Sequence, residues 1–384
     1  MRKIYLDFSA TTPIDRRVIY SMSSVFGTVY GNASSVHSFG REARALLEQS
    51  RERIAGALGA KSDEIFFTSG GTESNNYAIK GIVQVAARKG KREIITSPVE
   101  HHAVLRPIET LKEAGYDLRF VPVDSTGRVD PADVKRLIGP NTALVSLMLV
   151  NNEIGTINDI RSVGGLLREE GIPFHTDIVQ AVGKLEINLE DLNVDLASIS
   201  AHKFYGPKGI GAIYIRKGTA IDSYIEGGSQ EGNRRAGTEN VPLAVGFATA
   251  AAIANECLAS DLLRVSRLNE SLKVALQQRL DGILFNGHPT QSVRHIVSLS
   301  FDSKLMALDG DALIMGMDLR GVAVTSGSAC TSGSLQPSHV LTALGRDIAT
   351  ARATVRFSIG RTTTEEELTY AADCLKEVIE RMKK

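Results

Sequence analysis

The chain has little cysteine, no tryptophan and no excess of charge of either sign. Its 384 residues include three cysteines, Cys257, Cys330 and Cys374, which are widely spaced and form no CxxC pair. An odd number of distant cysteines argues against a disulfide framework and against a zinc site. Lys and Arg together number 44, as do Asp and Glu, and this balance gives no support to a role on nucleic acid or on a membrane surface.

Long apolar runs are also lacking. We find none that would span a bilayer, and the first residues, MRKIYLDFSATT, do not contain the apolar core of a signal peptide. Hydrophobic residues make up 43% of the chain and charged residues 23%, a composition typical of globular proteins. We therefore expect a soluble cytoplasmic protein, and the length favours two domains.

Short apolar runs alternate with longer helical patterns, which predicts an α/β fold with a mostly parallel sheet. The expected strands are 64–68, 92–97, 116–123, 142–150, 173–177, 195–200 and 211–216, and the expected helices are 73–88, 103–114, 131–138 and 159–170. A long helix over 241–280 is followed by strands at 295–301, 322–326 and 353–359 and by a helix from Glu365. We predict a large domain of residues 16–259 and a smaller α+β domain formed by residues 1–15 and 260–384.

Ligands of open α/β sheets bind outside the carboxyl ends of the strands, so polar residues at those ends are examined first. In FFTSGGTESNN, residues 66–76, a Gly-rich turn follows an apolar strand, and Thr72 with Glu73 opens a helix. Gly70 and Gly71 let the backbone approach a ligand, and the helix N-terminus offers N–H groups to an anion. By itself this pattern is more often an ordinary capped turn than a phosphate site.

A second stretch, FHTDIVQAVGK over residues 174–184, places Asp177 at the end of an apolar strand and Gln180 three residues later. A carboxylate in that position most often caps the next helix. It is also placed to hold a protonated ring nitrogen of a cofactor. Both interpretations remain open on this stretch alone.

A third stretch, SISAHKFYGPKGIGAIYIR over residues 198–216, places Ser200, His202 and Lys203 after a strand and before a Gly-Pro turn. A lysine directed into a crevice is partly desolvated, which lowers its pKa and makes the neutral amine available for Schiff-base formation. The alternative is a surface lysine in a loop. The dense Ser, His, Gly and Pro surroundings favour the functional interpretation.

Together these stretches supply the parts of a pyridoxal phosphate (PLP) site: an imine-forming lysine, an acid for the pyridine nitrogen and a phosphate cradle. His101, in SPVEHHAVL over residues 97–105, can place an imidazole on the cofactor ring. Its neighbour His102 is expected to point elsewhere.

Cys330 lies in TSGSACTSGSL, residues 325–335, among serines, glycines and threonines. Most lone cysteines are small buried hydrophobes, whereas these neighbours predict a mobile, exposed loop. Cys257 and Cys374 lie in helical patterns and are expected to be structural and inert.

The chain resembles the cysteine desulfurases of the NifS/IscS type, which belong to the class V aminotransferase superfamily with the PLP fold type I. The similarity runs in order along nearly the whole chain, so accidental matching is not a serious rival. It is carried by YLDFSATTP (5–13), GNASSVHSFG (31–40), TSGGTESNN (68–76), EHHAVL (100–105), NNEIGT (151–156), HTDIVQAVGK (175–184), SAHKFYGPKGIG (200–211), RRAGTEN (234–240), SGSACTSGSLQPSHVL (326–341) and VRFSIGR (355–361).

The resemblance implies a role for each matching position. Lys203 corresponds to the lysine that carries PLP, Asp177 to the acid on the pyridine nitrogen and Gln180 to the partner of the ring 3-oxygen. His101 corresponds to the residue that stacks on the ring and moves protons, and Asn152 falls on a further cofactor-binding position. The phosphate end is implied to comprise Gly71, Thr72, Glu73, Ser200 and His202.

Two further implications concern the partner subunit and the substrate. Thr238 matches a phosphate ligand given by the other subunit, which implies an obligate homodimer. Arg356 matches the arginine that binds the substrate carboxylate, with Asn32 nearby, and a bidentate arginine suits that anion. No resident metal site is implied, and Cys330 is considered only as a transient iron–sulfur cluster ligand.

The implied reaction explains the exposed cysteine. L-Cysteine replaces Lys203 on PLP, the freed amine removes the α-proton, and the Cys330 thiolate attacks the substrate sulfur. The products are L-alanine and a persulfide on Cys330, a reversible state of a nucleophilic cysteine. A Gly- and Ser-rich segment would let this thiol collect sulfur and then present it to an acceptor.

Several positions depart from the common family form. Ala33 stands where proline is usual, Gly71 where alanine or cysteine is common, and Ile178-Val179 replace a small pair. None of these removes a functional side chain. The chain ends in ERMKK without the LSPLW-like tail that helps longer relatives to dock a scaffold, so delivery of sulfur to such a scaffold is less secure than desulfuration.

Three alternatives are considered. A selenocysteine lyase or second-group desulfurase typically carries a short RTGHHC-type cysteine loop, unlike the longer form here. A transaminase or β-eliminating lyase would not need Cys330. A catalytically silent binding protein is disfavoured by the presence of Lys203, Asp177, His101 and Arg356. The sequence leaves the sulfur acceptor open between an iron–sulfur scaffold, a tRNA-thiolating protein and a nitrogenase system.

Overall fold

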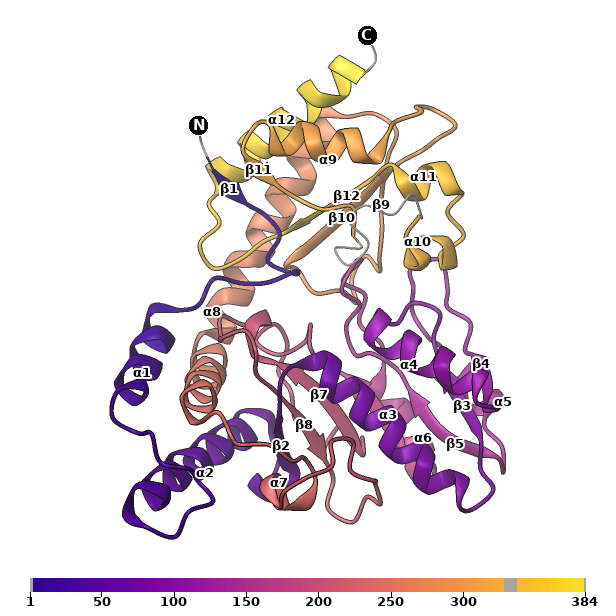
Figure 1. Cartoon of the computed structure of the whole chain (residues 1–384). Helices are drawn as coiled ribbons and strands as arrows, with labels where there is room; N and C mark the ends of the chain where they lie inside the picture. The colour runs from indigo at the N-terminus through magenta and orange to yellow at the C-terminus, as the bar shows by residue number, and fades with distance from the viewer. Residues whose placement is uncertain (1–2, 328–336, 383–384) are drawn as a thin grey trace.

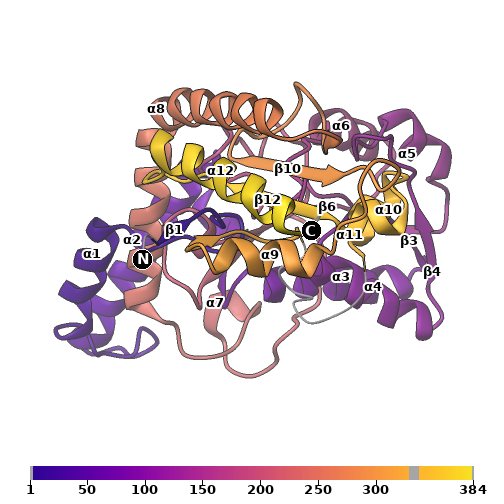
Figure 2. The ribbon, with the colours of Figure 1, turned by 90° about the horizontal axis from the view of Figure 1, so that it is seen from above.

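The computed structural model describes residues 3–327 and 337–382, which form two regions, each around its own β-sheet (Figure 1). The lower region in Figure 1 holds a seven-stranded sheet, and the upper one holds a three-stranded and a two-stranded sheet. Both ends of the chain lie in the upper region (Figures 1 and 2).

The seven-stranded sheet is mostly parallel. β8 runs antiparallel to both of its neighbours, β2 and β7, and every other neighbouring pair is parallel. The prediction of an α/β fold with a mostly parallel sheet is thereby confirmed. In spatial order the strands are β2 (Ile65–Thr68), β8 (Gly211–Ile215), β7 (Leu196–Ser200), β6 (Phe174–Asp177), β5 (Thr142–Ser146), β3 (Glu93–Thr96) and β4 (Asp117–Phe120).

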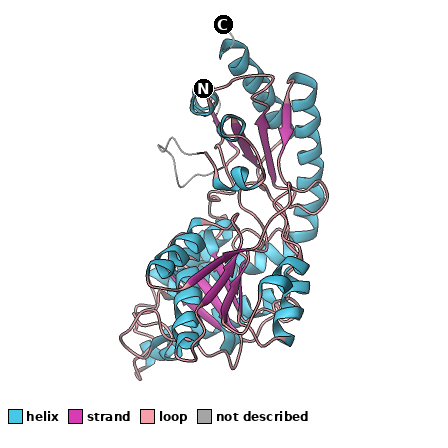
Figure 3. Cartoon of the chain, turned by 90° about the vertical axis from the view of Figure 1, so that its right-hand side faces the viewer, coloured by secondary structure: helices cyan, strands magenta, loops and turns pink. Residues whose placement is uncertain are grey.

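Helices cover both faces of this sheet (Figure 3). Every strand except the edge strand β4 is buried along its whole length, which explains the continuous apolar runs in the sequence. The helices of this region are α1 (Arg16–Phe26), α2 (Ser38–Leu58), α3 (Gly71–Ala87), α4 (His102–Glu113), α5 (Pro131–Leu137), α6 (Ile160–Glu169) and the short α7 (Gln230–Asn233).

One helix of 39 residues, α8 (Val241–Arg279), connects the two regions (Figure 1). It packs against α1 and α2 in the lower region and against α12 (Glu365–Met382) in the upper one. Within the described ranges it is the one helix whose length and composition would allow it to cross a membrane, but half of its apolar window is buried inside the protein. Its apolar character is that of a core helix.

The upper region has a three-stranded antiparallel sheet and a two-stranded parallel one. β10 (Ile296–Phe301) lies between β9 (Ile283–Phe285) and β12 (Thr354–Ser358), and β1 (Ile4–Tyr5) pairs in parallel with β11 (Val322–Ala323). Its core includes residues from both ends of the chain, because β1 packs in it together with α12. The remaining helices here are α9 (Gly310–Asp318), α10 (His339–Ala343) and α11 (Ile348–Arg352).

The structure differs from the sequence prediction mainly at element ends. The strand expected over 142–150 ends at Ser146, although the segment after it stays beside β6, where the N–H groups of Leu147 and Leu149 donate to the carbonyl oxygens of His175 and Asp177 at 3.1 and 3.0 Å. α1 and α2 were not predicted. Both are amphipathic helices that pack on α8, so their role becomes evident only once that partner is placed.

Candidate active site

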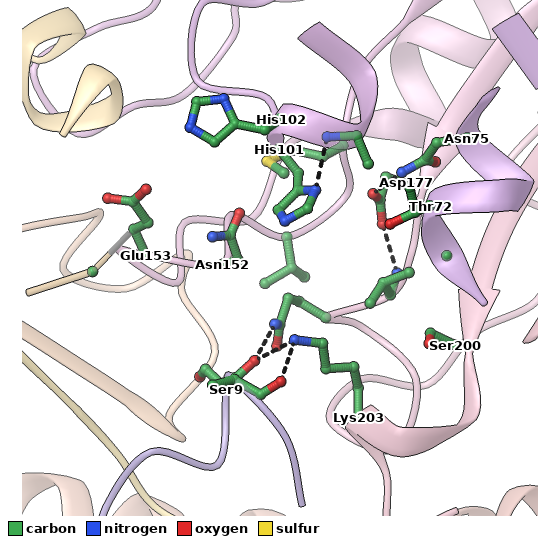
Figure 4. A pocket seen from close by; sticks show the side chains of 18 of the residues that line it. Ser9, Thr72, Asn75, His101, His102, Asn152, Glu153, Asp177, Ser200 and Lys203 are labelled. Atoms are coloured by element: carbon green, nitrogen blue, oxygen red, sulfur yellow. Dashed lines mark hydrogen bonds between the residues drawn. The ribbon is translucent and has the colours of Figure 1, made fainter. Parts of the chain in front are cut away.

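A cavity of about 290 Å³ lies between the two regions, at the carboxyl ends of the parallel strands. Figure 4 shows its side chains converging from several elements. The strand ends contribute residues after β2, β3, β5, β6 and β7, and the upper region contributes Arg356 and Gly327. The cavity therefore lies where open α/β sheets usually bind their ligands, outside the carboxyl ends of the strands.

Lys203 reaches the floor of this cavity from a short 3₁₀ turn, Ala201–Lys203, that follows β7 directly. Its Nζ donates hydrogen bonds to the carbonyl oxygens of Ser9 at 2.7 Å and Ala10 at 2.8 Å (Figure 4). These carbonyls belong to the segment after β1, which crosses the cavity. The amine is therefore held at a fixed place by the main chain of a distant part of the sequence.

Asp177 ends β6, and its two carboxylate oxygens accept hydrogen bonds from different parts of the chain. Its Oδ1 accepts the Val179 N–H at 2.9 Å, as a turn-capping carboxylate does, and its Oδ2 accepts a bond from Asn75 Nδ2 at 2.7 Å. The residue is buried and also lines the cavity. Asn75, on α3, holds the carboxylate in place while its own Oδ1 has no donor within the described structure.

His101 is the N-cap of α4, and its Nδ1 accepts the Ala103 N–H at 3.0 Å. In the neutral ring the proton is therefore on Nε2. Burial lowers the pKa of His101, the positive charges of Lys203 and His339 lower it further, and Asp177 opposes them. A neutral imidazole with a defined tautomer thus faces the cavity.

The side chain of His102 points in a different direction from that of His101. Its ring lies 4.6 Å from the ring of His339, centroid to centroid, at the edge of the cavity. Figure 4 shows it directed away from Lys203 and Asp177.

The N-terminus of α3 lies at the end of the cavity where the sequence predicts a bound anion, and we call this the anion-binding end. Its N-cap, Gly70, has no side chain to satisfy the first N–H groups, which leaves them for a ligand. A Cβ on Gly71 would lie 2.8 Å from Val179 Cγ2, so any other residue at this position would require Val179 to shift. Thr72 and Ser200 line the same end of the cavity.

His202 lies beside this end, with its Nδ1 3.1 Å from Thr11 Oγ1. Burial lowers its pKa to about 4, and the neighbouring lysines, Lys203 first, act in the same direction. His202 is therefore neutral near pH 7. A neutral imidazole can donate one hydrogen bond to an anion without adding a full charge.

Arg356, on β12, is 2% exposed and faces the cavity from the upper region. Its Nη1 donates to the carbonyl oxygens of Asn152 at 2.8 Å and Gly327 at 3.0 Å, and its Nη2 donates to Asp7 Oδ1 at 2.8 Å. Its Nε–H has no acceptor within the described residues. Three of the five N–H donors of the guanidinium thus fix it in place, and its Nε–H and the second N–H of Nη2 are left for a carboxylate.

Gln180 is buried and forms a hydrogen bond with the partly buried Lys184. Gln180 Nε2 donates to the Ser9 carbonyl oxygen at 2.9 Å, and its Oε1 accepts a bond from Lys184 Nζ at 3.0 Å. Burial lowers the pKa of Lys184 to about 7, with help from the charges of Lys203 and Arg356.

Three residues expected at the site do not line the main cavity in the single chain. Glu73 lies at the anion-binding end, but its carboxylate pairs with Arg235 at 2.8 Å. Asn32 is exposed on the connection between α1 and α2, where its Oδ1 accepts the Ser34 N–H at 2.8 Å, and Thr238 is exposed. Cys330 lies outside the described residues.

The other two cysteines are not at the cavity. Cys374 is buried in α12, and Cys257 is partly buried on α8.

Sequence reasoning missed Asp7, Asn75, Glu100 and Glu153. All four stand inside motifs quoted above, so a signal existed, but nothing in the sequence paired Asp7 with an arginine 349 positions away. Glu100 is completely buried beside His101, and burial raises its pKa to about 8.

The arrangement fits pyridoxal phosphate. A fixed amine, a buried carboxylate and an imidazole surround one cavity, and a helix N-terminus with two glycines closes one end. At Gly70 the absence of a side chain lets an anion come close to the backbone N–H groups that open α3, as a phosphate group needs.

Both the sequence and the fold of this chain are similar to those of known proteins. The family model described as aminotransferase class-V matches residues 4–370. A cysteine desulfurase IscS from Dictyoglomus turgidum is 47% identical over 382 residues, covering all of this chain and 96% of that protein.

Two solved structures resemble the fold closely. A NifS-like protein superposes with a TM-score of 0.91 at 37% identity, covering 99% of this chain and 100% of that one. A structure described as SspA in complex with cysteine has a TM-score of 0.82 at 35% identity, covering 93% of this chain and 99% of that one.

Proposed function

Because the chain belongs to the aminotransferase class-V family, we propose that its cavity carries out the PLP-dependent cysteine desulfurase reaction named for its relatives. The enzyme takes sulfur from L-cysteine and releases L-alanine. The observation that carries this conclusion is the convergence of Lys203, Asp177 and His101 on one cavity that Arg356 also lines. An amine, an acid and a carboxylate-binding guanidinium are what an amino-acid enzyme of this type requires.

Each cofactor-binding role follows from a position described above. Lys203 would bind the PLP carbonyl carbon, Asp177 would hold the protonated pyridine nitrogen, and His101 would face the ring. The α3 N-terminus with Thr72, Ser200 and His202 would hold the phosphate. PLP supplies an electron sink for the negative charge that develops at the substrate α-carbon.

The chain's own residues then orient the substrate and move its proton. Arg356 binds the substrate carboxylate through donors that Asp7, Asn152 and Gly327 leave free. Lys203, once its amine is free, takes the α-proton as general base. The carbonyls of Ser9 and Ala10 accept from its Nζ and stabilise the resulting ammonium.

Cys330 supplies the sulfur acceptor in this proposal. Its thiolate attacks the sulfur of the bound substrate, so that an S–S bond forms while the bond from sulfur to the β-carbon breaks. The electron pair of that bond stays with the carbon skeleton, which takes up protons and leaves as L-alanine. The enzyme keeps a persulfide on Cys330. A thiol can later reduce this persulfide or take over its outer sulfur atom.

The wider setting is also part of the proposal. Residues 16–259 would form the large domain and residues 1–15 with 260–384 the small one, which is consistent with the separate hydrophobic cores of the two regions. The exposed Thr238 would reach the PLP phosphate of a second copy in a cytoplasmic homodimer. The persulfide would serve iron–sulfur cluster assembly or another sulfur-requiring pathway.

The decisive experiment compares wild type with Cys330→Ala, both loaded with PLP and supplied with L-cysteine and a thiol reductant. Alanine and sulfide are measured together. Cys257→Ala is the matched control, because Cys257 lies on α8 away from the cavity. We expect alanine and sulfide from wild type and Cys257→Ala, and a loss of at least about 10²-fold for Cys330→Ala.

Other outcomes would change the assignment. Equal turnover by Cys330→Ala would make the chain a β-eliminating lyase, which needs no cysteine nucleophile. Absence of a cofactor absorbance band at about 400 nm after loading would favour a binding protein without this chemistry.

A further inference from the structure

Tyr205 has a backbone conformation that a tyrosine rarely adopts. It closely follows Lys203 in the sequence, and its φ is +68°, in the left-handed region where glycine and asparagine are usual. Tyr205 ends the turn that carries Lys203, and the N–H of Gly206 donates back to the Ala201 carbonyl oxygen at 3.0 Å. In this type of helix end the left-handed position normally holds glycine. A tyrosine there needs contacts that compensate for the backbone strain.

The first set of contacts comes from the segment between β1 and α1. The hydroxyl of Thr12 accepts the Tyr205 N–H at 2.7 Å and donates to the His202 carbonyl oxygen at 2.9 Å. In an ordinary helix end of this type, that N–H would bond directly to that carbonyl. The buried Thr12 is thus inserted between residues on either side of Lys203. The Asp15 N–H also donates to the Tyr205 carbonyl oxygen, at 3.0 Å.

The second set of contacts comes from the upper region. Arg361 follows β12, and its guanidinium carbon lies 4.5 Å from the centre of the Tyr205 ring. The backbone N–H of Arg361 donates to the Tyr205 hydroxyl oxygen at 2.7 Å. The guanidinium is itself held by Asp261 on α8, whose Oδ2 accepts from its Nε at 2.5 Å. A cation over the ring face and a hydrogen bond to the phenol oxygen therefore hold this side chain.

Both sets of contacts act on the residue that ends the Lys203 turn. We propose that Tyr205 is a positioning residue that directs the Lys203 amine at the α-proton of the substrate. Thr12 and Arg361 hold Tyr205 in the left-handed conformation that this direction requires. Glycine would adopt that conformation without strain, but it would offer no ring for Arg361 to contact.

The inference rests on the proposed function, in which the Lys203 amine is the general base. Proton transfer is fast only when the two atoms are held in the correct geometry. β12 carries Arg356, which binds the substrate carboxylate in that proposal, and Arg361 lies just beyond the end of this strand. The same part of the upper region thus reaches both the substrate and the turn of the base.

Exchange of the α-hydrogen of L-alanine for deuterium measures this step apart from sulfur transfer, because L-alanine has the carboxylate and the α-hydrogen of L-cysteine but no sulfur. PLP-loaded enzyme is incubated with L-alanine in heavy water, and the exchange is followed by proton NMR. Tyr205→Asn keeps a residue that tolerates a positive φ but removes the ring and the hydroxyl. We expect its exchange rate and its kcat for L-cysteine to fall about tenfold, with KM and PLP content unchanged.

The cofactor gives a second measurement on the same samples. The circular dichroism of the PLP band at about 400 nm depends on how rigidly Lys203 holds the ring. We expect this signal to weaken in Tyr205→Asn although the PLP content stays the same. Tyr205→Phe keeps the ring that Arg361 covers, so both its exchange rate and its dichroism should change less than those of Tyr205→Asn.

Thr12 offers a matched pair of variants. Thr12→Val removes the hydroxyl while keeping the shape of the side chain, and should slow exchange about tenfold. Thr12→Ser keeps the hydroxyl and should exchange at nearly the wild-type rate. Tyr116→Asn is the control, because it removes a tyrosine ring that lies 5.3 Å from the guanidinium of Arg92 and that is not among the residues lining the cavity. It should exchange as wild type does.

The proposal is overturned if Tyr205→Asn and Thr12→Val exchange the α-hydrogen at the wild-type rate, and Thr12→Val alone decides the matter if Tyr205→Asn does not fold. It is also overturned if PLP content, KM and exchange all change together, since Tyr205 would then support the whole cavity. If wild type exchanges the α-hydrogen but releases no sulfide from L-cysteine, the desulfurase assignment fails, and the exchange rates of the variants still decide the role of Tyr205.

Discussion

The two regions build the two ends of one cavity in different ways. In the lower region each functional side chain follows its own strand by a few residues, as Lys203 follows β7 and His101 follows β3. In the upper region the substrate end is assembled from separate segments, as in the ion pair between Arg356 and Asp7, 349 positions apart. The cofactor end is thus a local product of the sheet, whereas the substrate end depends on how the regions pack.

This difference predicts where the protein tolerates change. Polar groups at the cofactor end are held by their own turns and caps, as Asp177 is by Val179 and His101 by Ala103. At the substrate end each group is held by a residue from another segment. Substitutions at the substrate end should therefore change substrate binding more than cofactor binding, and the following predictions test that.

The largest effect is expected for Lys203→Ala. The substitution removes both the PLP-binding amine and the general base, so alanine formation at saturating L-cysteine should fall by at least about 10³-fold. The cofactor absorbance band near about 400 nm should shift, because PLP is no longer bound covalently. Lys217→Ala is the control, since Lys217 pairs with Asp63 at the surface. Turnover by Lys203→Ala within tenfold of wild type would contradict this role.

Arg356→Ala should reduce kcat/KM for L-cysteine about 10²-fold, mainly through KM, while PLP binding changes little. Asp7→Asn should act in the same direction with a smaller effect, because the guanidinium loses its ionic partner but stays in the cavity. Arg279→Ala removes a comparable ion pair, to Asp373 at 2.6 Å, on the surface of the upper region. A fall in kcat at unchanged KM would place Arg356 outside substrate binding.

The third prediction concerns pH and Glu100 in the lower region. Burial is the main reason that the pKa of this carboxyl is raised to about 8 from its ordinary value of 4.5. A raised carboxyl pKa means that the folded state holds a proton that the unfolded state loses. Stability therefore declines as pH rises from 4.5 through about 8 and is unaffected below that window.

Glu100→Gln removes this titration while keeping an oxygen for the Ser97 hydroxyl and the Met148 N–H. We expect the unfolding free energy of the variant relative to wild type to rise by about 1–2 kcal/mol between pH 6 and pH 8. Urea unfolding at several pH values measures it. Parallel pH profiles of the two proteins would show that Glu100 is ionised throughout.

The smallest effect is expected for Gly71→Ala at the cofactor end. The new Cβ would meet Val179 Cγ2 at 2.8 Å, so the PLP dissociation constant should rise about fivefold, the cost of a small steric shift. Adding Val179→Ala should restore the affinity, because it removes the clash. Gly56→Ala on α2, where a Cβ would meet nothing within 4 Å, is the control. An unchanged dissociation constant would show that Val179 moves freely.

Much of the cofactor end was predictable from the sequence. Asp177, Lys203 and the turn at Gly70 and Gly71 each follow an apolar run, and the carboxyl ends of parallel strands gather at one edge. The strands themselves were found because burial on both faces makes them continuously apolar. α1 and α2 were missed, since an amphipathic helix shows its purpose only against a partner such as α8.

The substrate end was predictable only in part. The motif resemblance named Arg356, but no pattern in the sequence indicated that Asp7 would hold it or that Ser338 would donate to Glu153. These are contacts between segments that lie far apart in the chain. They depend on the docking of one region on the other rather than on local periodicity.

The sequence by itself determined the family, the α/β class and the residue types that the chemistry needs, because strand burial, turn residues and motif order are written locally along the chain. Only the tertiary structure decided which partner fixes each side chain. The bond from the Ala103 N–H fixes the tautomer of His101, and burial keeps His202 neutral. The hydrogen bond from Ser338 to Glu153 joins two segments that lie far apart in the chain. Hydrogen bonds and desolvation depend on three-dimensional neighbours, and no one-dimensional spacing specifies them.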